Sequence, residues 1–317
     1  MDFDEYESAW KELWRSRHRN IFTFPGALKV WWREFGGNYE LNLLEVKENS
    51  ALIGIAPLII REDEAYFIGS PNIFDYLDFV IASGKENYFF NELIDFFKNK
   101  QIKCLDLKSV RHDSLVMTNL IELARKQMLE VSCNEEGSLL EMNLASNWDD
   151  YLNGLPSRYR HELRRKLRRF EEAGKTNFEI FDNIEKISGS MDLFFEQFKA
   201  CRIDKATFMT SRMEKFFRSF ITALSKAQLL KLGILELNDS EMAMVICLDD
   251  GETLYLYNNC FDPQHRELNL GFVSKALTIK YSIEKGRKMF NFLKGTERYK
   301  YHLGGKESKL YNCQILF

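Results

Sequence analysis

The same order of predicted elements occurs twice along the chain, and this repeat constrains the fold more than any single motif. In the first half, alternating or continuous apolar residues predict strands at 41–46, 51–60, 66–68 and 76–81, a helix at 86–99 and a strand at 103–107. In the second half, similar patterns predict strands at 230–237, 242–248 and 253–260, a helix at 273–285 ending at Gly286, and a strand at 288–293. The repeat predicts two similarly built α/β halves.

The length agrees with two domains. The chain has 317 residues, and single hydrophobic cores usually stop growing at roughly 250 to 300. Residues 139–144 alternate like a terminal strand, and Ser146-Asn147 can cap a helix that starts at Trp148. We therefore expect one domain over residues 1–145 and a second over residues 146–317.

Charge and cysteine content limit the partners and the compartment. The net charge is -3, so the chain as a whole does not attract nucleic acid or anionic lipid, and any polyanion site must be local. The six cysteines form no CxxC pair and are typical of buried free thiols in a reducing compartment. The N-terminus is acidic and the longest apolar run is 51–60, far short of the ~20 residues of a membrane helix. These features predict a cytoplasmic protein without a transmembrane segment.

Histidines give no sign of a metal site. They are widely separated and lack the spacing of metal ligands: His18, His112, His161, His265 and His302. The sequence predicts no metal.

A helix predicted over 157–173, after Pro156, carries an unusual density of positive charge. One face is apolar, with Tyr159, Leu163, Leu167 and Phe170. Seven basic residues share the rest of the helix, namely Arg158, Arg160, Arg164, Arg165, Lys166, Arg168 and Arg169. Two interpretations stay open: a solvated helix face, or a surface that binds a phosphate-bearing acceptor, tRNA or anionic lipid heads in peripheral contact with a membrane.

Several local runs then point to a family. They are Phe24-Pro25 with Trp31-Trp32 and Phe35-Gly36, residues 54–58 (GIAPL), residues 75–78 (DYLD), the basic helix, and residues 292–300 (FLKGTERYK). With these runs the chain resembles the acetyltransferase family named after the CelD and BcsL cellulose-biosynthesis proteins, and is similar to the Fem aminoacyl transferases. The resemblance implies an α/β fold of two tandem GNAT-like domains.

The resemblance also implies an activity. It implies transfer of an acetyl or other acyl group from a coenzyme A thioester to an amine or hydroxyl of a cell-envelope or polysaccharide precursor. A Fem-like enzyme would instead use aminoacyl-tRNA, and the basic helix would then belong to the tRNA surface. The third alternative is a catalytically silent module that binds a polyanion.

The donor site is expected in the second half. In a GNAT fold the pyrophosphate of the cofactor rests on the backbone N–H groups of a loop that leads into a helix N-terminus. Here that loop is 262–272, and the cofactor-binding candidates are Asn258, Asn259, Arg266, Gly271 and Phe272. An ordinary strand-to-helix turn is the alternative, because Asp262 and Glu267 would repel phosphate.

Catalytic candidates follow the last predicted strand. Acyl transfer needs a base for the acceptor's proton and an acid for the thiolate. Glu297 supplies a carboxylate, and Tyr299 suits the acid because a tyrosine pKa of about 10 is close to that of a thiol. Lys300 could anchor a phosphate or carboxylate. The alternative is that these residues form a solvated loop.

Two further candidates lie in the first half, and the basic helix supplies the rest. Asp78 is a catalytic candidate if it faces the cleft between the halves, but it could equally lie on the solvent face of an alternating strand. The acceptor-binding candidates are Tyr76, Arg158, Arg164 and Arg165.

Overall fold

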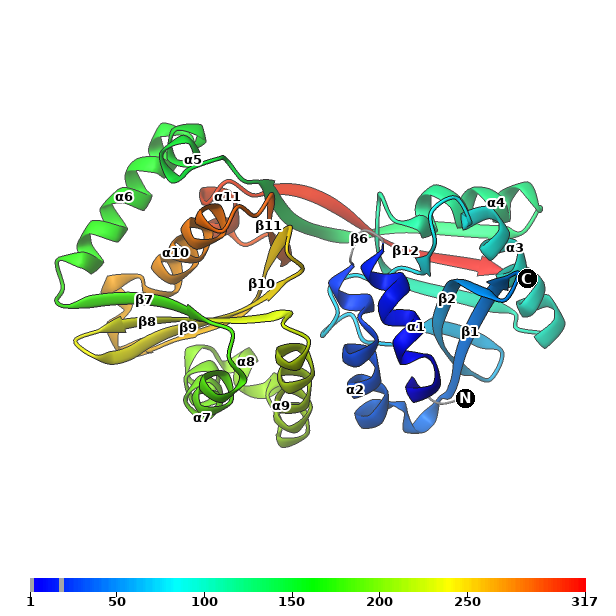
Figure 1. The fold of residues 1–317 in the computed structure, drawn as a ribbon. Coiled ribbons are helices and arrows are strands. Elements are labelled where there is room, and N and C mark those ends of the chain that lie inside the picture. Colours follow the sequence, from blue (N-terminus) through cyan, green and yellow to red (C-terminus); the bar gives the residue numbers. More distant parts are fainter. Residues whose placement is uncertain (1–2, 17–19) are drawn as a thin grey trace. The chain divides into compact units, whose positions relative to one another are not determined.

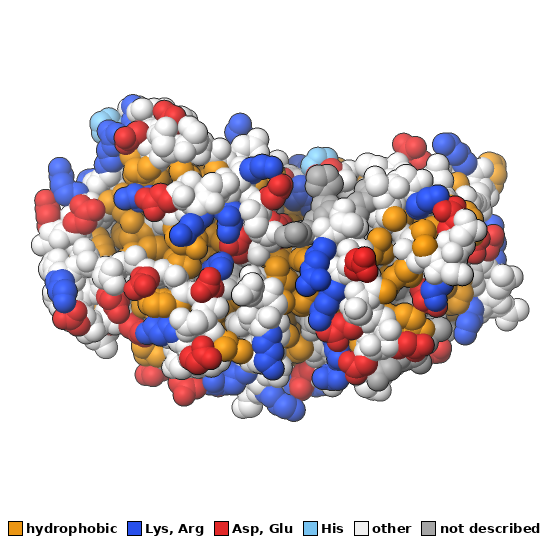
Figure 2. Space-filling model, in the orientation of Figure 1, with side chains coloured by type: hydrophobic (Ala, Val, Ile, Leu, Met, Phe, Trp, Pro, Cys, Tyr) orange, Lys and Arg blue, Asp and Glu red, His pale blue; other side chains and the backbone are white. Residues whose placement is uncertain are grey.

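A computed structural model describes residues 3–16 and 20–317 (Figure 1), so His18 lies outside the described residues. The chain forms two compact units. Unit 1 is Met1–Ser138 together with Ser308–Phe317, and unit 2 is Leu139–Glu307. Figure 2 shows acidic and basic side chains interspersed over the drawn face of each unit, in keeping with a net charge of -3.

In its described residues, unit 1 contains part of a large mixed sheet and four α-helices. Its strands are β1 (Glu40–Glu48), β2 (Ala51–Arg61), β3 (Glu64–Phe67), β4 (Val80–Ile81), β5 (Cys104–Arg111), the first part of β6 (Glu130–Asn143) and most of β12 (Lys306–Leu316). The hydrogen-bonded order is β1-β2-β3-β5-β12-β6, and β4 pairs with β2. The helices are α1 (Phe3–Arg15), α2 (Pro25–Phe35), α3 (Glu86–Lys100) and α4 (Ile121–Lys126), with a π-helical turn at Val116–Leu120.

The core of unit 1 is rich in phenylalanine. Phe89, Phe90 and Phe97 of α3 are fully buried, because the apolar residues of this helix recur at the spacing of one face. Gly54 of β2 lies directly beneath α3, and a Cβ atom there would come within 2.3 Å of the Phe89 ring. Glycine at this position therefore lets helix and sheet approach closely.

One strand predicted in unit 1 is wrong over most of its length. Only Val80–Ile81 of the segment 76–81 forms a strand. The preceding residues do not join the sheet because the Asp78 carboxylate bonds to backbone N–H groups at the start of the π-helical turn.

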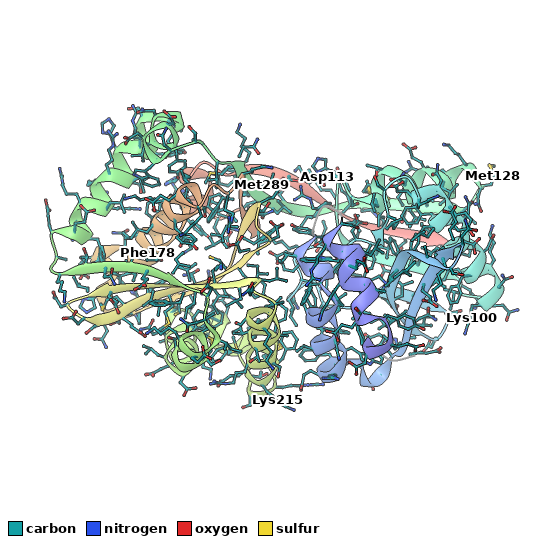
Figure 3. All side chains as sticks on the ribbon, in the orientation of Figure 1. Lys100, Asp113, Met128, Phe178, Lys215 and Met289 are labelled. Atoms are coloured by element: carbon teal, nitrogen blue, oxygen red, sulfur yellow. The ribbon has the colours of Figure 1, made fainter. Side chains whose placement is uncertain are left out.

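Unit 2 contains the remaining strands of this mixed sheet, with helices on both faces. Its strands are the end of β6, β7 (Thr176–Phe181), β8 (Leu230–Leu237), β9 (Ser240–Asp249), β10 (Thr253–Phe261) and β11 (Met289–Lys294). The order is β6-β11-β10-β9-β8-β7. Phe178 on β7 and Met289 at the start of β11 are labelled in Figure 3.

The helices of unit 2 fall into two groups (Figure 1). Those on one side of the sheet include α5 (Trp148–Gly154), α6 (Ser157–Glu171), α10 (Leu270–Glu284) and α11 (Arg298–His302). Those on the other side are α7 (Ile184–Cys201), α8 (Ile203–Phe208) and α9 (Ser211–Lys226). The predicted cap of α5 is confirmed, since Asn147 Oδ1 accepts from the Asp150 N–H at 2.9 Å.

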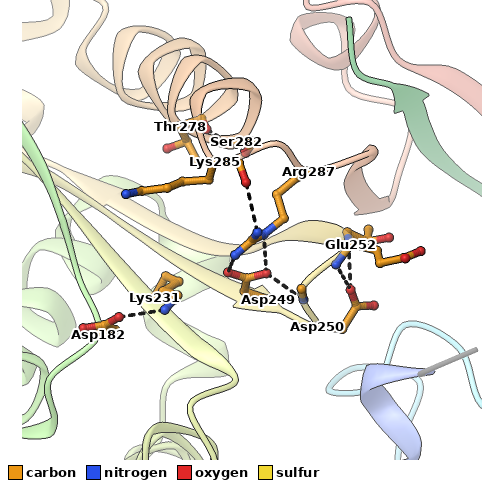
Figure 4. Close-up of polar contacts among 11 residues, drawn as sticks. Asp182, Lys231, Asp249, Asp250, Glu252, Thr278, Ser282, Lys285 and Arg287 are labelled. Carbon is orange, nitrogen blue, oxygen red and sulfur yellow. Dashed lines mark hydrogen bonds and ion pairs between the residues drawn. The ribbon is translucent and has the colours of Figure 1, made fainter. Parts of the chain in front are cut away.

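The β9–β10 hairpin is held by buried carboxylates (Figure 4). Asp249, which is 4% exposed, accepts two hydrogen bonds of 2.8 Å from the Nε and Nη2 atoms of Arg287. Asp250 accepts from the Thr253 N–H at 2.7 Å and from the Tyr255 hydroxyl at 2.7 Å. These contacts fix the start of β10 next to the loop that leads from α10 into β11.

All six cysteines are free thiols. Four are buried as predicted, but Cys133 and Cys201 are only half-buried. None of the helices in the described ranges is long and apolar enough to span a bilayer.

Candidate functional site

Two parallel strands separate at the centre of unit 2. β10 and β11 pair only over Thr253–Tyr255 and Met289–Asn291, although both strands continue beyond these residues. The register of β10 on β9 also shifts between Leu256 and Asn258, which marks a β-bulge at the same level. Ligands of open α/β sheets bind where the carboxyl ends of parallel strands leave a crevice. The carboxyl ends of β10 and β11 are therefore the candidate site.

The N-terminus of α10 follows β10 closely. The predicted loop 262–272 is partly helical, because Asp262 caps a 3₁₀ turn at Pro263–Leu268 and α10 begins at Leu270 rather than at residue 273. Asn269 precedes α10 in the left-handed conformation, with φ 55°, and its carbonyl accepts from the N–H groups of Phe272 and Val273. The N–H groups of Leu270 and Gly271 bond to no other described residue.

Two open N–H donors at a helix N-terminus suit an anion. Gly271 allows close approach at this turn, because a Cβ atom there would lie 2.9 Å from the Phe261 ring. Of the other predicted cofactor residues, Phe272 lies in the first turn of α10, and Asn258 and Asn259 lie half-buried on β10. Arg266 is exposed on the 3₁₀ turn.

Lys275 is a buried cation one turn into α10. Its side chain lies among the core positions of the helix, and the residue is 6% exposed. Its Nζ donates to the Gly271 carbonyl at 2.7 Å and lies 4.6 Å from the centre of the Tyr299 ring. Burial lowers the pKa of Lys275 to about 7, and the charge of Lys205 lowers it further in the same direction.

Lys205 brings a second cation to the same end of β10. It lies on α8, half-buried, and its Nζ donates to the Asn259 carbonyl at 2.6 Å and lies 4.3 Å from the centre of the Phe198 ring. Burial lowers the pKa of Lys205 as well. Among the described residues, no carboxylate oxygen lies within 4.0 Å of the Nζ atom of Lys205 or of Lys275.

Lys300 lies inside α11 and stabilises the protein's own backbone. It is 2% exposed, and its Nζ donates to three successive carbonyls, those of Leu293, Lys294 and Gly295, at 3.0, 2.6 and 3.1 Å. Glu297 Oε2 completes the set at 3.0 Å. Lys300 thus joins the end of β11 to α11. Tyr299 and Lys300 lie in this helix, whereas Glu297 precedes it and is exposed.

Tyr299 is half-buried against Lys275, and Glu297 beside it is exposed. The Tyr299 hydroxyl makes no hydrogen bond to a described residue. Burial, and then the Glu297 charge, raise the pKa of Tyr299 above its ordinary value. The phenol therefore stays protonated at neutral pH and can donate a hydrogen bond, but it is a weaker acid than the sequence argument assumed.

Tyr76 and Asp78 belong to unit 1. Tyr76 is buried, with its ring 5.1 Å from that of Phe22. Asp78 is half-buried, and its carboxylate accepts from the N–H groups of Leu115 at 2.8 Å, Val116 at 3.3 Å and Phe79 at 2.9 Å. Burial raises the pKa of Asp78 to about 7 against the opposite effect of these N–H groups. Asp78 therefore lies neither on a strand nor on the solvent face of one, because its carboxylate caps a helical turn.

The basic helix predicted over 157–173 is α6, and its expected apolar face is confirmed by the burial of Leu163 and Phe170. Blue side chains in Figure 2 mark the edge of unit 2 formed by this helix. Arg158, Arg164 and Arg165 are exposed and form no ion pair with any described residue. The other basic residues include three with partners: Arg160 with the Asn153 carbonyl, Lys166 with Glu162 and Arg168 with Glu172.

Unit 2 thus brings Gly271, Glu297, Tyr299 and the end of β10 together, whereas Tyr76 and Asp78 lie in unit 1. The sequence argument missed Lys205 and Lys275. The pattern of the predicted helix 273–285 gave no signal for Lys275, because Lys275 lies two residues from Val273 and from Leu277 and therefore on the opposite side of that helix. Lys205 had none, because its helix is only six residues long. In the described parts of the chain, no group of three or more His, Cys, Asp or Glu side chains could hold a metal.

A family comparison matches unit 2. Residues 157–301 match the family described as "Acetyltransferase (GNAT) domain". The matched segment runs from the start of α6 into α11 and includes the whole candidate site. No curated protein matches the chain at the level of sequence.

Solved structures resemble the chain over nearly its whole length. FemX has a TM-score of 0.68 at 13% identity, covering 100% of this chain and 96% of FemX. A C-terminal domain described as that of a lysylphosphatidylglycerol synthetase from Agrobacterium fabrum has a TM-score of 0.63 at 10% identity, covering 99% and 92%. A tandem GNAT protein from the clavulanic acid biosynthesis pathway has a TM-score of 0.51 at 10% identity, covering 99% and 97%. The predicted α/β fold of tandem GNAT-like halves is therefore confirmed.

Proposed function

We propose that this protein is an acyltransferase that moves an acyl group from a coenzyme A thioester to an amine or hydroxyl at the carboxyl ends of β10 and β11. The observation that carries the proposal is the separation of these strands beside the open N-terminus of α10. The GNAT match over residues 157–301 supports the reaction class.

In this proposal α10 holds the donor. The N–H groups of Leu270 and Gly271 would bind a phosphate oxygen, and the helix dipole favours negative charge at the same place. Phe272 and the end of β10, including Asn258 and Asn259, would contact the neutral arm of the donor. Arg266 is exposed close to this turn and would add positive charge.

The chemistry needs few groups. The acceptor nitrogen or oxygen attacks the thioester carbonyl and the C–S bond breaks. The Tyr299 hydroxyl donates a hydrogen bond to the leaving thiolate, which then takes its proton from water. The acceptor's proton passes to Glu297, whose exposed carboxylate can return it to water. Lys300 acts as a positioning residue, because it fixes the backbone between β11 and α11.

Isothermal titration with acetyl-CoA tests the donor site, and measurements of turnover test the role of Tyr299. Tyr299→Phe should lower kcat about 10²- to 10⁴-fold while leaving acetyl-CoA affinity nearly unchanged. Tyr301→Phe is the matched control, since Tyr301 lies on the same helix and its hydroxyl contacts Glu307. No heat from acetyl-CoA at millimolar concentration, or full turnover in Tyr299→Phe, would contradict the proposal.

A second candidate donor is aminoacyl-tRNA. The likeness to FemX covers the whole chain, and Arg158, Arg164 and Arg165 on α6 have no described ion-pair partner. In that case tRNA binding should weaken steeply with salt. For the leading proposal of acyl transfer from coenzyme A, we also propose a relationship to the CelD and BcsL family and an acceptor from cell-envelope or polysaccharide synthesis. If the protein is instead a catalytically silent module, it should bind a polyanion and show no turnover.

A further inference from the structure

Two lysines meet at the end of β10 without a counterion. Lys275 reaches this point from α10 and Lys205 from α8, and each Nζ donates to one backbone carbonyl. An ammonium group has three N–H donors, so each lysine keeps two for another partner. Two cations near the end of one strand attract an anion, and Lys275, which is buried, must otherwise lose its charge.

The neighbouring groups do not supply that anion. Glu297 acts on Lys275 only from a distance, and its own carboxylate is bound to Lys300 at 3.0 Å. Tyr299 offers a ring face and a phenol that stays protonated. Cys201 lies near both lysines, but its Sγ accepts from the Phe261 N–H at 3.3 Å and donates to the Phe261 carbonyl at 3.1 Å.

We propose that Lys205 and Lys275 form a subsite for a compact oxyanion, a carboxylate or phosphate that belongs to the acyl acceptor. The assignment to the acceptor rests on the proposed acyl transfer. Lys275 lies beside Tyr299, at the reacting end of the donor, and the thioester end of an acetyl-CoA carries no charge. Its phosphates are placed at the Leu270 and Gly271 N–H groups instead. An acid group in the acceptor is the remaining source of negative charge.

Titration with inorganic phosphate at constant ionic strength tests the subsite without knowledge of the acceptor. The wild type, Lys205→Met and Lys275→Met are compared by calorimetry at pH 6 and pH 9. Methionine is an apolar replacement of similar length, so both variants should fold. Lys280→Met is the control, because Lys280 lies on the same helix and its side chain is 44% exposed.

Each lysine variant should bind phosphate about tenfold more weakly, while Lys280→Met should match the wild type. The loss of affinity caused by Lys275→Met should be smaller at pH 9, where Lys275 is neutral in the free protein. Comparing the variant with the wild type at each pH cancels the change in the charge of phosphate itself. Phosphate that binds all four proteins equally would overturn the subsite.

A final arm separates the two sources of the oxyanion. Acetyl-CoA occupies the Leu270 and Gly271 N–H groups, where free phosphate can also bind, so the variants are compared again at saturating acetyl-CoA. The loss of phosphate affinity in Lys205→Met and Lys275→Met should persist, since donor and acceptor bind together. If acetyl-CoA abolishes this difference from the wild type, the lysines belong to the donor and the acceptor assignment is overturned. If acetyl-CoA does not bind at all, acyl transfer from coenzyme A fails, but the phosphate comparison among the variants still decides whether the subsite exists.

Discussion

Replacing Lys275 by methionine should stabilise the protein, and the gain should depend on pH. The ammonium group belongs to a residue that is only 6% exposed, and this burial lowers the pKa of Lys275 from 10.5 to about 7. A shift of this size costs the folded state about 5 kcal/mol below pH 7, because one pKa unit corresponds to about 1.4 kcal/mol. Methionine removes this cost and keeps most of the apolar contacts.

The direction of the pH effect follows from proton binding. Between pH 7 and about 10, the unfolded chain holds the proton on Lys275 more tightly than the folded protein does. The free energy of unfolding of the wild type therefore rises with pH through this window, and it rises no further above it. The advantage of Lys275→Met should fall by about 2.5 kcal/mol between pH 6 and pH 9.

Urea unfolding in phosphate-free buffer at pH 6, 7.5 and 9 measures this difference directly. Because both proteins share every other titrating group, subtracting the two free energies isolates Lys275. Lys280→Met on the same helix should show no such trend, since its side chain is 44% exposed. A difference between Lys275→Met and the wild type that stays constant from pH 6 to pH 9 would refute the reasoning.

Three further predictions concern positions outside the lysine pair. Arg287→Ala should cost about 3–5 kcal/mol in urea unfolding, because it leaves the buried Asp249 carboxylate without its partner; a loss below 1 kcal/mol would contradict this. Asp78→Ala should cost about 2–4 kcal/mol and Asp78→Asn less, since asparagine keeps one oxygen for the helical turn; equal losses would argue against capping. If tRNA is the donor, Arg164→Glu with Arg165→Glu should flatten the salt dependence of its binding while changing stability by less than about 0.5 kcal/mol; unaltered binding would leave α6 a solvated face.

Local periodicity was enough to predict most elements. The strand at 230–237 coincides with β8, and the helix at 86–99 differs from α3 by one residue. The strand at 76–81 failed because Asp78 bonds to a turn nearly forty residues later, and such a partner leaves no mark on the local pattern. Strand β12 was not predicted for a similar reason, since its partner β5 lies far away in sequence.

The candidate site was predictable only in part. Glu297, Tyr299 and Gly271 lie at the carboxyl ends of β10 and β11, where the order of elements had placed them. The sequence could not indicate that Lys300 turns inward onto three carbonyls, because the position of a side chain around a short helix depends on the packing beneath it. Nor could it show that α8 brings Lys205 toward Lys275.

The path of β12 has a consequence for the order in which the protein folds during synthesis. In unit 1, β12 fills the place between β5 and β6, and Leu310–Leu316 pairs with β5. The ribosome must add roughly 200 residues after β5 before this strand exists, which takes about 10 to 40 s at ordinary rates of translation. Throughout that interval β5 has an open edge of the kind that recruits chaperones or other strands. Unit 2 is continuous from Leu139 to Glu307 and needs no later segment, so the part of the protein made first is the last to be completed.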